Sequence, residues 1–213
     1  MEAKNLEDLD FSPVEKQFLN FAIGKYTSQI EAGDSDPDET QNSVTEAVYE
    51  AIDQINNHYI NEGEIKHNQR PSCKAGCSHC CNVMVAANER EVNLVVDYME
   101  QNNIQVDMNV LKIQSEITDT KEYVLSPHRK CVFLKDNMCS IYKVRPSSCR
   151  NYFVYSPPED CDTYNNTSNH DGQTLLLFNM DVVPLTLALM RSSPDGIFPK
   201  ILYDKLIEKQ SNL

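Results

Sequence analysis

The sequence predicts a mainly α-helical protein with a small β-hairpin, in which an acidic helical hairpin over residues 1–64 precedes an irregular α+β domain over residues 65–213. Three observations lead to this fold class. Apolar residues recur with the 3.6-residue period of amphipathic helices in both parts. Only one short stretch has two apolar runs around a turn, as a β-hairpin does. All eight cysteines lie in the second part, where they are suited to fasten a chain with little regular structure.

The helices of the first part are expected over residues 12–30 and 44–59. The second of these follows the i, i+3, i+4, i+7 rule closely. The polar segment 33–40 lies between them, so the two helices are expected to form a hairpin. Residues 61–72 are polar and contain a glycine and a proline, which predicts a linker into the second part.

In the second part, Asn88 stands three positions before Glu91, which is the spacing of a helix-capping box. A helix is therefore expected to begin there, and a further one over residues 108–124, with a proline beyond its end. At the end of the chain, residues 185–190 and 201–207 are apolar stripes that predict helix.

Between these helices, residues 131–142 read CVFLKDNMCSIY, two apolar runs around a Lys-Asp-Asn turn, and predict the hairpin. Pro146 then stands at the start of a short helix that contains Cys149. Residues 156–172 have the composition of a loop, and Cys161 lies within it.

Four cysteines are crowded into nine residues, CKAGCSHCC, and four more follow later in the chain. The first group is Cys73, Cys77, Cys80 and Cys81, and the second is Cys131, Cys139, Cys149 and Cys161. Disulfides are disfavoured because no secretory signal or membrane span is visible, and cytoplasmic thiols stay reduced. Metal thiolates are therefore the preferred interpretation, so that a metal would nucleate the domain. Disulfides and buried unreactive cysteines are the alternatives.

Cys77 and Cys80 have the C-x2-C spacing that offers two thiolates to one ion. The later cysteines are spaced irregularly, which disfavours a simple zinc ribbon. Eight thiols allow two zinc sites, one Fe–S cluster with spare thiols, or a cluster plus a separate metal. An Fe–S cluster, 4Fe–4S above all, is the preferred cofactor and zinc the alternative. The spacing leaves open which cysteines share a site.

The charge of the chain is uneven. Residues 1–64 carry 3 basic and 15 acidic side chains, whereas residues 65–213 carry 16 and 17. The acidic first part argues against nucleic acid or an anionic membrane as its partner. A solvated helical face explains this acidity most simply. The alternative is an acidic surface for a protein partner. The protein is expected in the cytoplasm.

Residues 121–150 carry seven basic side chains against two acidic ones. Cations stabilise a metal-thiolate anion, so Arg145 and Arg150 are candidates to hydrogen-bond sulfur or an anionic substrate. Interior salt bridges, or simple solvation of the basic segment, are the alternatives. His79 is a candidate alternative metal ligand. Weaker candidates are His67, His128 and His170.

The four apolar residues that follow Cys131 and Cys139 are expected to form an apolar shell around the thiolates, although core packing is the simpler explanation for the aromatic ones. They are Phe133, Leu134, Ile141 and Tyr142.

The order CKAGCSHCC, then CVFLKDNMCSIYKVRPSSCR, resembles the CxxCxxCC cysteine-cluster family, which is described as zinc- or iron-chelating. The resemblance spans Cys73 to Arg150 and includes the FL, IY, RP and CR pairs. The first gap here is three residues, where the family name implies two. One branch of the family is similar to flagellin lysine N-methylases, which implies a methyltransferase that uses S-adenosylmethionine, although no motif here supports that cofactor.

The sequence therefore predicts a metal-thiolate protein with redox or group-transfer chemistry, and leaves open whether it is an enzyme. A structural zinc-binding or metal-handling module is the first alternative, and a flagellin-methylase-like methyltransferase is the second. The sequence has no glycine-rich nucleotide loop and no recognisable catalytic triad.

Overall fold

The computed structural model describes residues 37–67, 70–74, 76–161 and 195–211, and the statements below concern these residues. The helices expected over residues 12–30 and 185–190 lie outside them, as does the end of the loop expected over residues 156–172. No helix in the described part of the chain is both long enough and apolar enough to cross a membrane.

The predicted fold class is confirmed, because the described chain is mainly helical with small antiparallel strand pairs. The α-helices are α2 (Pro37–His67), α3 (Glu89–Gln101), α4 (Met108–Glu116), α5 (Thr120–Leu125), α6 (Ser147–Arg150) and α8 (Phe198–Ser211). The 3-10 helices are η2 (His79–Asn82), η3 (Tyr142–Val144) and η4 (Pro158–Cys161). The strands are β1 (Ala86–Asn88), β2 (Leu134–Lys135), β3 (Met138–Cys139) and β4 (Asp195–Ile197).

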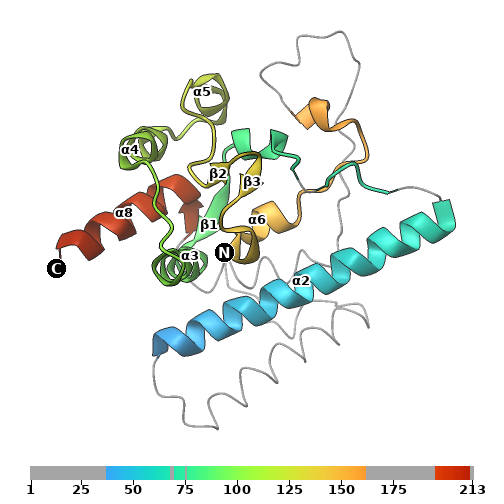
Figure 1. The fold of residues 1–213 in the computed structure, drawn as a ribbon, viewed down its shortest axis with the longest axis horizontal. Helices are drawn as coiled ribbons and strands as arrows, with labels where there is room; N and C mark the ends of the chain where they lie inside the picture. The colour runs from blue at the N-terminus through green and yellow to red at the C-terminus, as the bar shows by residue number, and fades with distance from the viewer. Residues whose placement is uncertain (1–36, 68–69, 75, 162–194, 212–213) are drawn as a thin grey trace, which may run out of the picture.

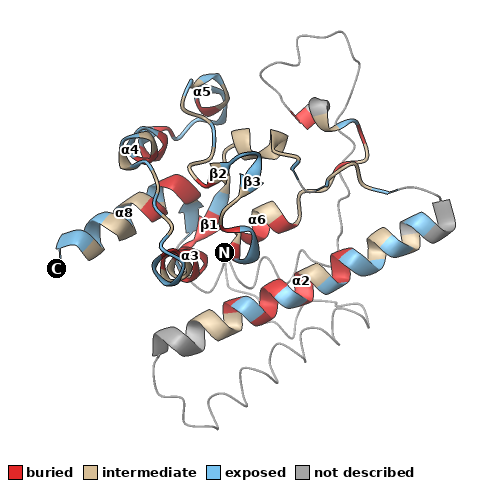
Figure 2. Cartoon of the chain, in the orientation of Figure 1, coloured by how far each residue is buried: buried red, intermediate tan, exposed pale blue. Residues whose placement is uncertain are grey.

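One hydrophobic core joins the long helix α2 to the cysteine-rich part of the chain. α2 packs on α3 and α6, while α8 packs on α3 and α4. Figure 1 shows α6 and the short strands at the centre, with α2 along one side and α4, α5 and α8 on the other. In Figure 2 the buried residues of α2 recur along the helix between exposed ones, and Ile52 and Ile55 are fully buried among them.

The second helix of the N-terminal part is confirmed, but it is longer than expected at both ends. α2 begins at Pro37, inside the expected break, because proline is well suited to the first helical position. It continues to His67, so the linker predicted over residues 61–72 is wrong for its first half. A single glycine costs a helix only about 1 kcal/mol, and Gly63 does not stop it. The proposed domain boundary after residue 64 falls in the last turn of α2, and that division stays a prediction.

The helix expected over residues 108–124 is two helices, α4 and α5. Ile117 has extended backbone angles, and the Asp119 side chain accepts a hydrogen bond from the backbone N–H of Glu122. An aspartate at this position caps a new helix in preference to continuing the old one. The apolar period alone did not reveal this break.

The hairpin is confirmed, with β2 pairing antiparallel to β3. Its turn residues, Asp136 and Asn137, have φ values of 48° and 60°. Two consecutive left-handed residues are typical of the tight type I′ hairpin turn, which Asp and Asn tolerate well. The short helix at Cys149 and the C-terminal helix are also confirmed, as α6 and within α8.

The capping box at the start of α3 is confirmed in both of its hydrogen bonds. The residues just before it form β1, which pairs with β4 in an antiparallel sheet that the sequence did not predict. The Phe198 N–H, at the start of α8, donates to the Val85 C=O at 2.8 Å. This pairing places the start of α8 beside β1, the strand that follows the first cysteine group.

Candidate metal site

Six of the eight cysteines line one cavity of about 570 Å³. They are Cys77, Cys80, Cys81, Cys131, Cys139 and Cys149. The rest of the lining is mainly apolar and includes Leu111 from α4 and Phe198 and Leu202 from α8. Cysteines from both groups in the sequence therefore line the same cavity.

Two backbone hydrogen bonds hold the two cysteine segments together. The Cys131 N–H donates to the Cys81 C=O at 2.8 Å, directly joining the start of the hairpin to the vicinal cysteine pair. The Ser72 N–H donates to the Val154 C=O at 2.7 Å, which fastens the chain just before Cys73. The segment that carries the first cysteine group is thus hydrogen-bonded to later parts of the chain near both of its ends.

The hairpin presents Cys131 and Cys139 in the same local way. The Cys131 sulfur accepts a hydrogen bond from the Phe133 N–H, and the Cys139 sulfur accepts one from the Ile141 N–H. Phe133 and Ile141 are 0% and 2% exposed, so core packing fixes the backbone that donates these bonds. Burial nevertheless outweighs the hydrogen bond at both thiols: it raises the pKa of Cys131 to about 12 and raises the pKa of Cys139.

The vicinal cysteines Cys80 and Cys81 lie in η2, and their pKa values are shifted in opposite directions. A hydrogen bond from the Cys81 thiol lowers the pKa of Cys80, and the positive charge of Arg145 acts in the same direction. The same hydrogen bond, together with burial and the charges of Cys80, Cys131 and Cys139, raises the pKa of Cys81. In the metal-free protein Cys80 is therefore the thiol that ionises most readily of this pair.

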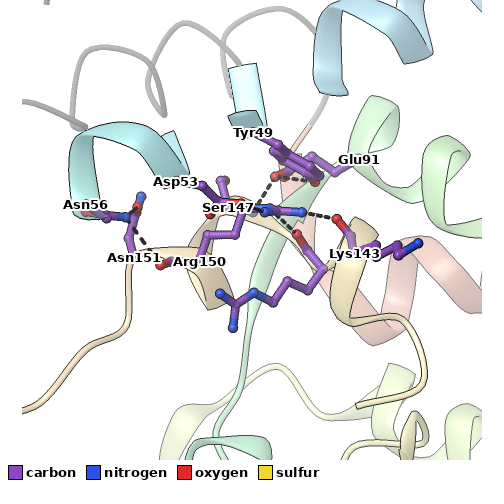
Figure 3. Close-up of polar contacts among 9 residues, drawn as sticks. Tyr49, Asp53, Asn56, Glu91, Lys143, Ser147, Arg150 and Asn151 are labelled. Carbon is purple, nitrogen blue, oxygen red and sulfur yellow. Dashed lines mark hydrogen bonds and ion pairs between the residues drawn. The ribbon is translucent and has the colours of Figure 1, made fainter. Parts of the chain in front are cut away.

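Cys149 lies in α6, whose first turn is held by a buried carboxylate. The Glu91 Oε1 atom accepts the Ser147 N–H at 2.7 Å and the Tyr49 hydroxyl at 3.1 Å, while Oε2 accepts the Asn88 N–H at 3.0 Å. Figure 3 shows this carboxylate between α2, α3 and α6. The sequence indicated Glu91 only as a capping residue. Its contacts with Tyr49 and Ser147 depend on tertiary packing and carry no local signal.

Arg145 lines the cavity, and its guanidinium lies 4.0 Å from the centroid of the Tyr142 ring. Its Nε atom is buried and has no hydrogen-bond partner, and no ion pair of Arg145 occurs within the described ranges. Its charge lowers the pKa values of Cys80, Cys139 and Cys149, although burial is the larger influence on the last two and raises them. Arg145 is thus the cation of the lining whose charge acts on the thiols, whereas Lys74, which also lines the cavity, is exposed.

Arg150 is not part of the cavity lining but packs against α2. It forms an ion pair with Asp53, donates to the C=O groups of Lys143 and Arg145, and lies 4.1 Å from the Tyr49 ring centroid (Figure 3). The interior salt bridge considered for the two arginines is therefore present for Arg150. This side chain joins α6 to α2.

Cys73 and Cys161 lie beside the cavity rather than in its lining. The Cys73 sulfur accepts the Val154 N–H, and its pKa is raised by burial and by the charges of Cys77 and Cys80. Cys161 is buried in η4, which packs against η2. Tyr152 lines the cavity, and its pKa is raised by burial and then by the charges of Cys161, Cys80 and Cys73.

The apolar shell is present in part. Leu134, Ile141 and Tyr142 line the cavity, whereas Phe133 lies in the core beneath it and stacks on Phe198. Tyr142 is 59% exposed, and its ring stacks against the Arg145 guanidinium.

The histidines do not contribute to the described lining. His79 lies in η2 between two cavity cysteines, but the lining does not include it. His128 lines a separate surface hollow beside α4 and α5. His170 and the side chain of His67 fall outside the described residues.

The donor chemistry of the cavity fits zinc or iron. Its described lining has six thiols and neither carboxylates nor imidazoles. Thiolates select zinc and Fe–S clusters over magnesium or calcium. In the described part of the chain, no group of three or more His, Cys, Asp or Glu side chains is arranged so that it could hold a metal ion. Ligation would therefore require the cysteine side chains to rearrange.

Residues 72–171 match the model of the CxxCxxCC family, described as "Putative zinc- or iron-chelating domain". The match covers a little under half of the chain and includes all eight cysteines. The cysteine-rich part is thus similar to this family, and the description of the family supports metal binding. No curated protein and no solved structure matches the chain significantly.

Proposed function

We propose that the cysteine cavity binds an Fe–S cluster, 4Fe–4S in the simplest case, and that the protein performs redox or group-transfer chemistry there. The observation that carries this proposal is the convergence of six thiols on one cavity of about 570 Å³. A single structural zinc ion needs four thiolates and little space. A 4Fe–4S cluster is also held by four thiolates, but it occupies more space than a single ion, and the further thiols line the same cavity.

The surroundings of the thiols suit a cluster. Backbone N–H groups of Phe133 and Ile141 donate to two of the sulfurs, and hydrogen bonds to sulfur tune cluster potentials. A 4Fe–4S core of charge +2 with four thiolates has a net charge of about −2, which Arg145 is placed to offset. The apolar lining limits access of water. When bound, the cluster would supply electron transfer or Lewis acidity.

The second candidate function is a structural zinc module without catalysis. It is favoured by the shortness of the local structure, since β2 and β3 contain two residues each and α6 contains four. Such segments are held together well by a metal that binds thiols from several of them. In the described part of the chain we find no observation that favours the methyltransferase alternative. A protein partner for the acidic N-terminal part stays a prediction.

Anaerobic purification followed by visible absorption spectroscopy and iron, sulfide and zinc analysis tests the proposal. The expected result is a coloured protein with iron and acid-labile sulfide in equal amounts. A colourless protein with stoichiometric zinc and no sulfide would overturn the cluster and favour the zinc module. Removal of zinc should then reduce the helical far-ultraviolet circular dichroism signal, because a structural metal couples binding to folding.

A further inference from the structure

We infer that the cysteine cavity also binds a small organic carboxylate with an apolar body, and that Arg145 holds the carboxylate group. The apolar body would lie against α4 and α8. As a substrate site this rests on the proposed function, because it names the class of molecule on which the metal would act. Binding of the carboxylate depends on Arg145 and on the apolar wall, so it can be measured with and without metal.

One wall of the cavity comes from elements that carry no cysteine. Leu111 of α4 and Phe198 and Leu202 of α8 line the cavity, and all three are buried. α8 packs directly on α4, and Figure 1 shows both helices on the same side of the β2–β3 hairpin. A metal held by thiols takes its ligands from other segments. This wall therefore offers apolar surface that metal binding does not use.

The volume of the cavity suits an organic ligand. It is about 570 Å³, and small-molecule sites in proteins have volumes of about 300–1,000 Å³. A cavity of about 150 Å³ already holds benzene, so a small aryl or alkyl acid needs only part of the space. Sites of this kind are mainly apolar and have a few polar groups that orient the ligand.

Arg145 supplies the orienting group. Its Nε atom is buried, and it has no hydrogen-bond partner among the described residues. The guanidinium lies 4.0 Å from the Tyr142 ring centroid, so stacking uses its face, whereas its N–H donors lie in its plane and can pair with a carboxylate. A buried donor without a partner is unfavourable, and a ligand that accepts its hydrogen bond therefore gains affinity.

The charge of the lining selects an anion. The lining includes two cations, Arg145 and Lys74, and its described residues include no Asp, Glu or His. A carboxylate carries a single negative charge and matches the forked donors of one guanidinium. A phosphate has more charge and more acceptor oxygens, which a single guanidinium in an apolar cavity satisfies less well. The lining thus favours a monoanionic carboxylate.

A ligand can enter beside the tip of the hairpin. Four of the lining residues there are exposed, namely Lys74, Asn137, Met138 and Tyr142. The Ser78 hydroxyl donates to the Asn137 side-chain oxygen at 3.2 Å, which joins the first cysteine segment to the hairpin turn. The cavity therefore reaches solvent at the hairpin tip, while its wall at α4 and α8 is buried.

Isothermal titration calorimetry with 3-phenylpropionate tests the inference, on the anaerobically isolated protein and on the reduced, metal-free full-length chain. The ligand controls are 3-phenylpropanamide, which lacks the charge, and acetate, which lacks the apolar body. The carboxylate should bind at one equivalent and at least about tenfold more tightly than either control. Arg145→Met should weaken its binding about 10- to 100-fold and remove the preference over the amide. Lys143→Met, which changes an exposed cation outside the described lining, should bind like the natural protein.

The outcomes separate this inference from the proposed function. Equal affinities for the carboxylate and the amide in the natural protein, or no binding at millimolar concentration, would overturn the inference without any variant having to fold. Unchanged affinity in an Arg145→Met variant that is folded by circular dichroism would also overturn it, as would binding that the metal-loaded protein loses. Arg145-dependent binding by protein isolated without metal would support the carboxylate site and overturn the metal proposal.

Discussion

The backbone N–H of Cys131 donates a 2.8 Å hydrogen bond to the C=O of Cys81. This bond joins the start of the hairpin to the end of the first cysteine group, so it fixes one point of contact between the two segments. Because it involves only backbone atoms, it can form before any metal binds. The cavity is thus partly preorganised by the polypeptide, and several predictions concern the residues that maintain this arrangement.

The two arginines of the RPSSCR segment are predicted to differ in role. Arg150→Met should lower the free energy of unfolding by about 2–4 kcal/mol, because it removes charge-assisted bonds of a side chain that is 4% exposed. Arg145→Met should leave the metal-free protein nearly as stable but weaken metal binding about 10- to 100-fold, as outer-shell substitutions do. Urea unfolding and competition with a chelator measure the two effects.

Each arginine variant is the control for the other. Equal losses of stability in both variants, with equal metal affinities, would show that the guanidinium facing the thiols has no special relation to the metal. A large loss of metal affinity in Arg150→Met alone would show that Arg150, and not Arg145, supplies the counter-charge.

Glu91→Gln should reduce the free energy of unfolding by about 2–3 kcal/mol, because the buried carboxylate accepts three hydrogen bonds and the amide can replace only part of them. The matched control is Glu89→Gln, an exposed residue in the same first turn of α3. That change should have an effect within about 0.5 kcal/mol. Chemical denaturation of both variants checks the difference, and indistinguishable midpoints would contradict the role assigned to Glu91.

The hairpin turn provides a test of how far local backbone geometry supports the site. Asp136 has a φ of 48°, which a β-branched residue adopts only with strain. Asp136→Val should therefore cost about 1–2 kcal/mol and weaken metal binding through displacement of Cys139. Asp136→Gly removes the same side chain without strain and is the control. Thermal melts and metal titration of the two variants should separate, and coincident results would argue against a left-handed turn.

The stability of the metal-free protein should fall as the pH rises above about 8.5, the ordinary pKa of a thiol. Burial raises the pKa of Cys131 to about 12 in the folded protein, so the folded state keeps a proton that the unfolded state releases. This contribution is fully present below about pH 8.5 and is lost toward pH 12, at about 1.4 kcal/mol per pH unit for this thiol.

Urea midpoints of the metal-free protein between neutral and alkaline pH measure this slope. The Cys131→Ser variant lacks the thiol and should lose stability less steeply with rising pH. Identical slopes for the two proteins would show that Cys131 is not protected from ionisation in the folded state.

Elements with a local cause were predictable from the sequence. The capping box of Asn88 and Glu91, the hairpin turn at Asp136 and Asn137, and the buried face of α2 each depend on neighbouring residues alone. The break between α4 and α5 was missed because the Asp119 cap interrupted an apolar period that continues beyond it. The β1–β4 sheet was missed because its strands lie far apart in the chain and are three residues long.

From the amino-acid order alone came the fold class, the eight thiols and their metal-binding character, because composition, spacing and local backbone preference suffice for these. The neighbours of each thiol came only from the folded chain. Arg145 and Arg150 looked equivalent as candidates, yet packing turned one toward the sulfurs and the other onto Asp53. Likewise the backbone hydrogen bond between Cys131 and Cys81 joins segments that lie far apart in the chain. Such contacts depend on how separate segments pack, which spacing along the chain does not encode.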